Sequence, residues 1–374
     1  MLNRRFVILT AILGASLAIA AQSPTTLKDA FRDSFYVGAA VNAGQFTGTD
    51  LRGAAIVSKQ FNSITPENVL KWERVHPRPG VYDFALPDKY VEFGEKNHMF
   101  IVGHCLVWHS QVPDWVFEDE KGKPLAREAL LQRMRDHIFA VVGRYKGRIA
   151  SWDVVNEALN DDGSLRQTKW LQIIGEDYIA KAFEYAHQAD PQAQLNYNDY
   201  SLENEAKRNG AIALIKKLQA QGIPVAAVGI QGHDSLDWPS AALEEATIEA
   251  FAKLGVKVAI TELDIDVLPP VAPGSADVSL NVKADPKLNP YVNGLPDAVQ
   301  KALAERYAGL FGVYRKDRAV MSRVTLWGVT DGDSWRNDWP VVGRTSYPLL
   351  FDRMGEPKPA FDAVIRQAAQ PVQP

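Results

Sequence analysis

The chain has 374 residues, of which 46% are hydrophobic and 23% are charged, and this composition is typical of a folded globular protein. It excludes a disordered or fibrous protein, and the single cysteine, Cys105, excludes a scaffold held by internal disulfides. The formal net charge at pH 7 is −4, which disfavours nucleic acid as a partner.

The first twenty residues differ from the rest of the chain. Arg4 and Arg5 precede an apolar run over residues 6–20, which ends in small residues before Ala21. This pattern predicts a secretory signal peptide over residues 1–20, a mature domain over residues 21–374, and export to the periplasm or the cell exterior. The run is shorter than the ~20 residues that a membrane-spanning helix needs, so we expect no membrane attachment after cleavage. Cleavage removes two Arg and no acid, which leaves 39 basic and 45 acidic residues and a net charge of −6.

Short apolar or β-branched segments alternate with helical patterns along the mature chain. We expect eight strands, over residues 35–41, 63–65, 100–106, 151–156, 194–198, 225–231, 256–263 and 324–329. Between strands, apolar residues recur at helical spacing: Leu131, Met134, Ile138, Val141 and Tyr145; Leu171, Ile174, Tyr178, Ala182, Phe183 and Ala186; Val299, Leu303, Tyr307, Leu310 and Tyr314. Gly222 and Gly255 follow helical stretches, where glycine commonly ends a helix in the left-handed conformation. The alternation predicts an α/β fold, a single-domain (β/α)8 TIM barrel with enlarged top-face loops, rather than an open doubly wound sheet.

A Pro-rich segment over residues 268–296 follows the seventh strand and predicts a long loop at the top of the barrel. Its acids and amides offer oxygen ligands for calcium, although their spacing lacks the order of a defined calcium loop: Asp277, Asn281, Asp285, Asn289 and Asn293. A solvated loop is the favoured interpretation. His104 and His109 lie on a strand that leads into a loop, so they do not converge on one ion as a helical pair four residues apart would. We therefore expect neither a metal nor a cofactor.

Two strand ends each deliver a glutamate. The fourth segment ends at Asn156 and Glu157, and the seventh ends around Glu262 and Asp264. Catalytic groups of a barrel stand at the C-terminal ends of its strands. One such Glu alone would indicate a salt bridge or a helix cap, but strands four and seven lie across the barrel mouth from each other. Two carboxylates so placed suit glycosidic cleavage, in which one acid protonates the leaving oxygen and the other meets the anomeric carbon.

The remaining strand ends carry groups that bind sugar hydroxyls or stack on sugar rings. These are Glu67, Asn68, Lys71 and Trp72, then His104, Trp108 and His109, then Asn198, Asp199 and Tyr200, then Gln231 and His233, and finally Trp327, Trp335 and Trp339. We expect Trp108 and Trp152 to be packing residues at the barrel top, so that Trp108 supports the pocket from behind.

The motifs resemble the endo-β-1,4-xylanases of glycoside hydrolase family 10. The resemblance runs from residues 35–42 to residues 358–361, and within it residues 103–111, 152–157 and 261–264 look like that family's signatures in the right order. Ser201 stands where the family often has Asn, and residues 331–335 differ locally from common forms, so no preference for branched xylans follows.

The resemblance implies a retaining mechanism, with Glu157 as general acid/base and Glu262 as nucleophile. It places Lys71, His104, Asn156, Gln231, His233 and Trp327 around the sugar that is cleaved, Glu67, Asn68 and Trp335 at the neighbouring glycone site, and Tyr200 on the leaving-group side. Asp264 would orient His233, which would hold Glu262 ionised. The expected partner is xylan or its oligosaccharides, bound by a monomer.

Three other functions are compatible with parts of this pattern. A related barrel endoglucanase or mannanase also carries Asn-Glu after strand four and Glu after strand seven, but the surroundings of Lys71, His104 and Gln231 favour xylan. A catalytically inactive sugar-binding barrel is disfavoured because both carboxylates and their supporting groups are present. A metal-dependent hydrolase is rejected on the His spacing.

Overall fold

Eight parallel strands close into a barrel in the computed structural model, which describes residues 26–271 and 280–371. The strands are β1 (Tyr36–Val41), β2 (Ser63–Pro66), β3 (Phe100–Val107), β4 (Ser151–Asn156), β5 (Gln194–Asp199), β6 (Ala227–Ile230), β8 (Lys257–Asp266) and β9 (Met321–Leu326), and a short β7 (His233–Ser235) pairs with the upper end of β8. Neighbours in the chain are neighbours in the sheet, and the barrel closes where β9 pairs with β1 and β6 pairs with β8. All C-terminal strand ends therefore meet at one face, and the predicted TIM barrel is confirmed.

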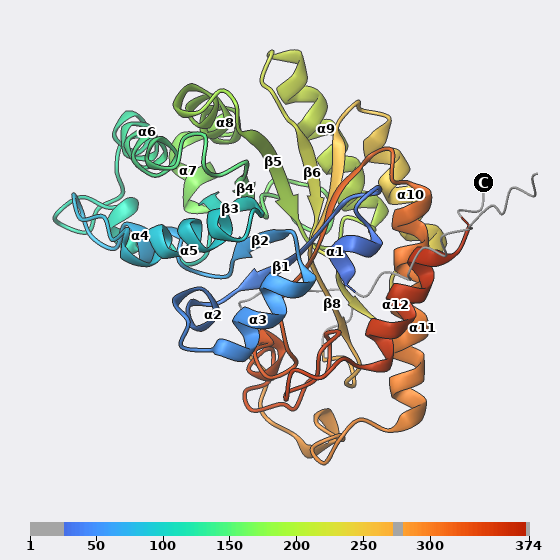
Figure 1. Ribbon diagram of the computed structural model, residues 1–374. Helices are drawn as coiled ribbons and strands as arrows, with labels where there is room; N and C mark the ends of the chain where they lie inside the picture. The colour runs from blue at the N-terminus through green and yellow to red at the C-terminus, as the bar shows by residue number, and fades with distance from the viewer. Residues whose placement is uncertain (1–25, 272–279, 372–374) are drawn as a thin grey trace, which may run out of the picture.

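Helices surround the strands (Figure 1). They are α1 (Leu27–Ala30), α2 (Ala43–Thr47), α3 (Leu51–Gln60), α4 (Trp72–Val75), α5 (Ala85–Lys96), α6 (Arg127–Arg144), α7 (Lys169–Ile174), α8 (Tyr178–Ala189), α9 (Glu205–Ala220), α10 (Ala241–Ala252), α11 (Asp297–Lys316) and α12 (Pro359–Ala369), with 3-10 helices η1 (Asp114–Val116), η2 (Pro286–Leu288) and η3 (Trp335–Asn337). The predicted apolar faces of α6 and α11 are buried, which explains why these sequences form helices against a barrel.

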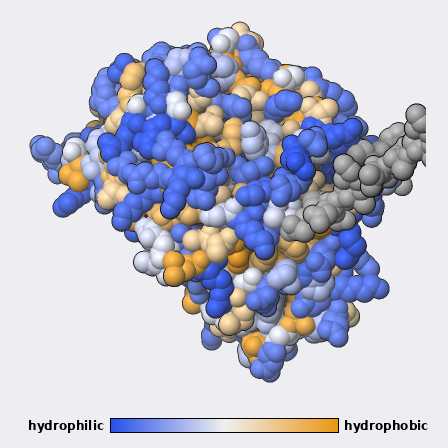
Figure 2. Space-filling view, viewed as in Figure 1, coloured by the Kyte–Doolittle hydropathy of each residue, from blue (hydrophilic) through white to orange (hydrophobic). Residues whose placement is uncertain are grey.

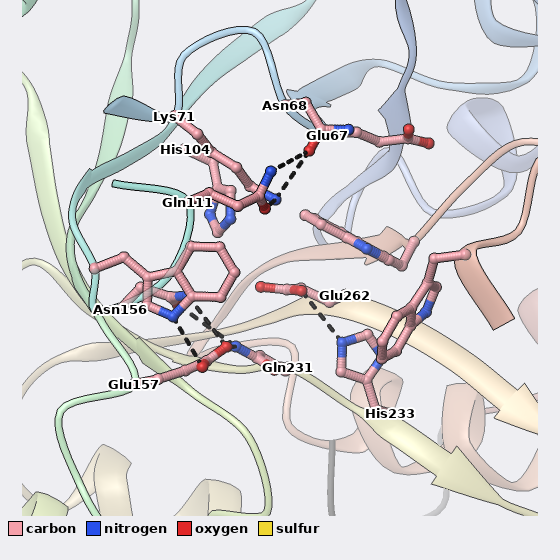
Figure 3. A pocket seen from close by; sticks show the side chains of 13 residues that line it. Glu67, Asn68, Lys71, His104, Gln111, Asn156, Glu157, Gln231, His233 and Glu262 are labelled. Atoms are coloured by element: carbon pink, nitrogen blue, oxygen red, sulfur yellow. Dashed lines mark hydrogen bonds and ion pairs between the residues drawn. The ribbon is translucent and has the colours of Figure 1, made fainter. Parts of the chain in front are cut away.

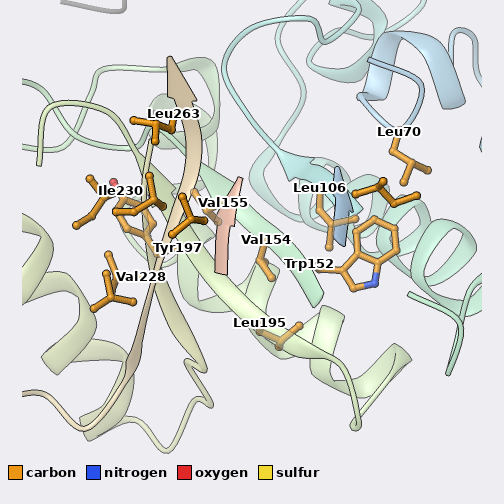
Figure 4. Packing of buried hydrophobic residues seen from close by; sticks show 14 of the residues in the cluster. Leu70, Leu106, Trp152, Val154, Val155, Leu195, Tyr197, Val228, Ile230 and Leu263 are labelled. Atoms are coloured by element: carbon orange, nitrogen blue, oxygen red, sulfur yellow. The ribbon is translucent and has the colours of Figure 1, made fainter. Parts of the chain in front are cut away.

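The hydrophobic core fills the space between the strands and this layer of helices. Figure 4 shows the part of it that packs on β4, β5, β6 and β8, where side chains from successive strands interdigitate. Trp152 is fully buried, as predicted, and packs directly on the backbone of Gly103 in β3. A Cβ at Gly103 would stand 2.1 Å from the indole ring, so glycine is required at this close approach.

Three local predictions need correction. The eighth strand begins at Met321, not at 324, because its polar residue Arg323 points into the barrel, where it is 2% exposed and pairs with Asp153. The apolar face that begins at Leu171 belongs to two helices, since Gly175 at φ 97° ends α7. The strand β7 was not predicted. Gly222 and Gly255 do adopt the left-handed conformation, at φ 74° and 76°.

The segment that follows β8 is a loop in its described part, with η2 as its single short helical turn there. Its polar side chains hold the local backbone: Asp285 accepts from the N–H of Lys287, and Asn289 accepts from that of Thr345. Asp277 and the predicted signal peptide lie outside the described residues. Within residues 26–271 and 280–371, no helix has both the length and the apolarity to cross a bilayer. Figure 2 shows a mainly hydrophilic face with scattered apolar residues.

Candidate active site

A cavity of about 180 Å³ opens at the C-terminal ends of the strands. Thirteen side chains line it (Figure 3): Glu67, Asn68, Lys71, His104, Trp108, Gln111, Asn156, Glu157, Gln231, His233, Glu262, Trp327 and Trp335. The structure therefore brings together the residues that were predicted to surround the cleaved sugar and the neighbouring glycone site, together with Trp108. The other strand-end residues that were named as sugar-binding do not line this cavity: Trp72, His109, Asn198, Asp199, Tyr200 and Trp339. Asp264, which was predicted to orient His233, lies behind it. The cavity also contains Gln111, which the sequence argument did not single out.

Glu157 follows β4 directly and enters the cavity from a left-handed backbone conformation at φ 56°. Such a conformation is rare for a residue with a side chain and is concentrated at functional sites. Its carboxyl group accepts hydrogen bonds from the indole N–H of Trp108 at 2.9 Å, the amide of Gln231 at 3.0 Å and that of Asn156 at 3.2 Å. Burial raises the pKa of Glu157, against the opposing effect of the bonds from Gln231 and Trp108, and the nearby charge of Glu262 adds to the increase. Burial thus suits Glu157 to hold a proton, and its neutral donors limit the rise in its pKa.

Glu262 lies within β8 and has a different set of partners. The amide of Asn198 donates to Oε1 at 2.7 Å, and Nε2 of His233 lies 3.2 Å from Oε2. Nδ1 of His233 lies 3.0 Å from Asp264. Burial disfavours the charged imidazole, but Asp264 and Glu262 outweigh burial and raise the pKa of His233 to about 9. At neutral pH a doubly protonated His233 thus donates to both carboxyl groups, and Glu262 faces a positively charged donor.

Asp264 stands behind the cavity and does not line it. It is fully buried and accepts from Trp335 at 2.6 Å and from Arg336 at 2.8 Å. Burial alone would raise the pKa of Asp264, but the charges of Arg336 and His233 lower it to about 2. The ring of Trp335 faces the cavity and stacks on Trp339 at 4.4 Å between ring centroids.

Lys71, Asn68 and Gln111 form a hydrogen-bonded group on another wall of the cavity. The ammonium of Lys71 donates to Gln111 at 2.6 Å and to Asn68 at 3.2 Å, and it lies 4.9 Å from the centroid of the Trp108 ring. Burial raises the pKa of the adjacent Glu67 to about 7, although the charge of Lys71 opposes this. These groups offer donors and acceptors to sugar hydroxyls.

His104 is oriented from inside the barrel. Its Nδ1 lies 3.1 Å from Oδ2 of Asp153, whose other oxygen faces Arg323 at 3.4 Å. The ring meets that of Trp327 edge to face, with centroids 5.4 Å apart. The polar interior of the barrel thus fixes a side chain of the cavity.

Two residues have roles that the sequence argument missed. Asn198, at the end of β5, is completely buried and donates to Asn156 at 2.8 Å as well as to Glu262, so it links the two catalytic strands. Trp108 is buried, as expected of a packing residue, but it also lines the cavity and donates to Glu157. The feature of the sequence that could have indicated these roles is the position of both residues at or just after strand ends.

Tyr200 does not reach the cavity. Its side chain is 3% exposed, its hydroxyl accepts from Arg166 at 2.6 Å, and the ammonium of Lys207 lies 3.4 Å from its ring centroid. Lys207 is itself fully buried and pairs with Asp199 at 3.0 Å. These contacts hold Tyr200 in the wall beneath the loop that follows β4.

The remaining question about the site is whether residues 26–271 and 280–371 could hold a metal ion. Among them no group of three or more His, Cys, Asp or Glu side chains is arranged to hold an ion. Nδ1 of His104 faces Asp153. His76 and His137 do not line the cavity, and their Nδ1 atoms lie 3.2 Å from each other.

Comparison with known proteins assigns the chain to a family. Residues 26–367 match the model of glycosyl hydrolase family 10. The chain is 47% identical over 351 residues to endo-1,4-beta-xylanase A of Xylanibacter ruminicola, with 94% of this chain and 95% of the relative covered. A solved GH10 endoxylanase from a sugarcane soil metagenome is 47% identical, with a TM-score of 0.87 over 92% of this chain and 100% of that one. A mutant structure in complex with xylotriose is 38% identical, with a TM-score of 0.82 over 91% and 99% of the two chains. The chain belongs to glycosyl hydrolase family 10.

Proposed function

We propose that the protein is an endo-1,4-β-xylanase that cleaves internal bonds of xylan with retention of configuration at the anomeric carbon. The observation that carries this proposal is the contrast between two carboxyl groups on one cavity. Glu157 receives neutral donors and has a raised pKa, whereas Glu262 receives a bond from charged His233. Two carboxyl groups with different protonation states are what a retaining glycosidase needs.

In the first step, the protonated Glu157 donates its proton to the glycosidic oxygen while an oxygen of Glu262 attacks the anomeric carbon. The bond from that carbon to the leaving sugar breaks, and an ester between the sugar and Glu262 forms. Asn198 and His233 contact the two oxygens of Glu262 and hold its carboxyl group in place for this attack.

In the second step, Glu157 is ionised and accepts a proton from water, whose oxygen attacks the same carbon from the opposite face. The ester bond breaks, and the two inversions together yield a β-configured product. Trp108 and Gln231 donate to Glu157 in this ionised form, so they orient the carboxylate that accepts the proton.

The substrate follows from the family and from the walls of the cavity. Relatives up to 47% identical are xylanases, and a related structure contains xylotriose. The rings of Trp327 and Trp335 offer apolar faces to a pyranose ring, while Glu67, Asn68 and Lys71 offer polar groups to its hydroxyls. Polar and aromatic groups at several strand ends suit an internal stretch of polymer.

The mechanism is tested with alanine variants and an aryl xylobioside that carries a dinitrophenyl leaving group. Glu262→Ala should lose hydrolysis of every substrate. Glu157→Ala should still form the glycosyl-enzyme, because this leaving group needs no acid, and azide should then speed turnover and give a β-glycosyl azide. An α-glycosyl azide from Glu262→Ala is compatible, since azide then replaces the nucleophile. If NMR finds α-xylose units as the first hydrolysis product of the unmodified enzyme, Glu262 is not the nucleophile.

The substrate is tested with purified xylan, carboxymethyl cellulose and mannan side by side. Short xylo-oligosaccharides should appear early from xylan, together with a rapid fall in viscosity. Faster hydrolysis of cellulose or mannan would favour the related barrel endoglucanase or mannanase, and xylose as the sole early product would indicate an exo-acting enzyme.

We also propose that residues 1–20 direct export, on the strength of the charged and apolar pattern of that segment. N-terminal sequencing of enzyme recovered outside the cytoplasm should begin at Ala21. A mature protein that retains residues 1–20 would contradict this.

A further inference from the structure

Arg336 lies outside the lining of the cavity and contacts Asp264, which stands behind it. It follows Trp335 in η3, and its side chain is 6% exposed. Nε and Nη2 lie 2.8 and 2.7 Å from Oδ1 of Asp264, and Nη1 lies 3.3 Å from Asp266. A buried guanidinium is therefore committed to a carboxylate that does not touch substrate.

Asp264 joins this guanidinium to the cavity. Its Oδ1 also faces Nδ1 of His233 at 3.0 Å, and its Oδ2 accepts from Trp335 at 2.6 Å. His233 in turn reaches Glu262. A continuous line of hydrogen bonds thus runs from Arg336 through Asp264 and His233 to the nucleophile.

The charges around Asp264 come from several elements. They are Glu262 and Asp266 of β8, His233 and Asp234 of β7, Arg306 and Tyr307 of α11, and Arg336 and Arg344 of the region after β9. Arg306 is engaged with Asp234 at 3.1 Å, and Arg344 faces Asp266 at 3.5 Å. Among the described residues, His233 and Arg336 are thus the two cations in direct contact with Asp264.

We propose that Arg336 is a positioning residue that keeps Asp264 ionised, so that His233 retains its second proton and presents a charged N–H to Glu262 in acidic solution. This inference rests on the proposed role of Glu262 as nucleophile. It adds to that role the group that sets the acidic limit of activity.

The physical reason is competition for one proton within the line. An opposite charge within about 4–6 Å lowers the pKa of a carboxyl group by roughly 1–3 units, so Asp264 without Arg336 takes up a proton at higher pH. A protonated Asp264 no longer stabilises the charged form of His233. Glu262 then loses the cationic donor that faces its carboxylate, and its attack on the anomeric carbon slows.

The test uses the dinitrophenyl xylobioside, because its glycosylation needs no proton from Glu157 and the acid limb of kcat/KM then reports the nucleophile alone. Arg336→Met should move the acid limb to higher pH by on the order of one unit, with kcat/KM near pH 7 within severalfold of the wild-type value. Arg336→Lys keeps the positive charge, so its acid limb should lie close to the wild-type position.

Arg344→Met is the matched control. The side chain of Arg344 is 1% exposed, and this residue follows Arg336 closely in the chain, but its ion-pair partner is Asp266 and not Asp264. The acid limb of this variant should stay at the wild-type position. An equal shift in Arg344→Met, or an unmoved limb in folded Arg336→Met, would overturn the proposal. Should Arg336→Met fail to fold, Arg336→Gln decides by the same criterion.

A measurement on the unmodified enzyme is independent of both variants. Nitrogen-15 NMR should find both ring nitrogens of His233 protonated throughout the acid limb, and a neutral imidazole at pH 5 would overturn the proposal. Failure of the proposed function looks different: Glu262→Ala would retain full activity on the dinitrophenyl substrate, whatever happens at Arg336.

Discussion

The hydrogen bond from Trp108 to Glu157 makes a specific prediction about the alkaline limit of activity. Trp108→Phe keeps an aromatic ring beside Lys71 but removes the N–H that lies 2.9 Å from Oε2 of Glu157. This bond stabilises the ionised carboxylate and so holds down a pKa that burial raises. The variant should therefore keep Glu157 protonated to higher pH, and the alkaline limb of kcat/KM on xylan should move upward.

The size of the shift follows from the energy of the bond. A hydrogen bond to a charged group contributes about 1.5–3 kcal/mol, and one pKa unit corresponds to about 1.36 kcal/mol. The upper bound is thus about two units. Glu157 keeps its bonds from Gln231 and Asn156, and water replaces part of the lost bond, so we expect about one unit.

The assay is the pH dependence of kcat/KM for a xylo-oligosaccharide, whose leaving group needs a proton, and for the dinitrophenyl xylobioside, whose leaving group does not. The alkaline limb should move for the first substrate. The second should have no alkaline limb from Glu157 in either protein, because kcat/KM reports glycosylation and not the later base-catalysed step.

Trp152→Phe is the matched control, since its indole N–H is buried without a partner and lies away from Glu157. It makes the same chemical change without removing a bond to the acid. The reasoning is refuted by an alkaline limb that stays in place or moves downward in folded Trp108→Phe, and equally by an upward shift of the same size in Trp152→Phe.

Three further outcomes are expected. Trp335→Ala should narrow the preference for xylan over cellulose, because the ring occupies space that the hydroxymethyl group at C5 of glucose needs; an unchanged kcat/KM ratio for aryl xylobioside and aryl cellobioside would remove Trp335 from this role. Asn198→Ala should lower kcat/KM about 10- to 150-fold, since it deletes the 2.7 Å bond to charged Glu262, and a loss below twofold in steady-state assays would contradict this. Burial raises the pKa of Glu67 from 4.5 to about 7, so the stability that protonated Glu67 contributes is fully present below pH 4.5 and is lost as pH rises through 7. The Tm of the wild type should therefore fall relative to that of Glu67→Gln over this interval. A difference in Tm that stays constant with pH would contradict this prediction.

The sequence was most informative where local pattern and position in a barrel agree. Alternating strands and helices predicted the barrel, and ten of the thirteen side chains that line the cavity were named in advance from the strand ends. Trp335 came from the family resemblance, Trp108 was expected behind the pocket, and Gln111 was not singled out. The reason is geometric, because the C-terminal ends of parallel strands in a closed barrel must meet at one face.

Predictions from the sequence were wrong or incomplete where distant residues decide the local environment. The eighth strand was predicted to begin at residue 324, but Arg323 finds Asp153 as a partner in the barrel interior and the strand begins at Met321. Tyr200 also stands at a strand end, but Lys207 and Arg166 hold it in the protein wall, outside the cavity. Its place on the leaving-group side stays a prediction. Neither of these contacts can be recognised from the residues next to Arg323 or Tyr200 in the sequence.

The amino-acid sequence by itself determined which residues can do the chemistry and at which end of the barrel they stand. It did not determine what makes two identical side chains different. Gln231, which donates a hydrogen bond to Glu157, is 74 residues away from it in the sequence. Asn198, which donates one to Glu262, is 64 residues away from it. Because the pKa of a carboxyl group depends on its burial and on the charges that face it, only the tertiary structure could give Glu157 neutral donors and Glu262 a charged His233.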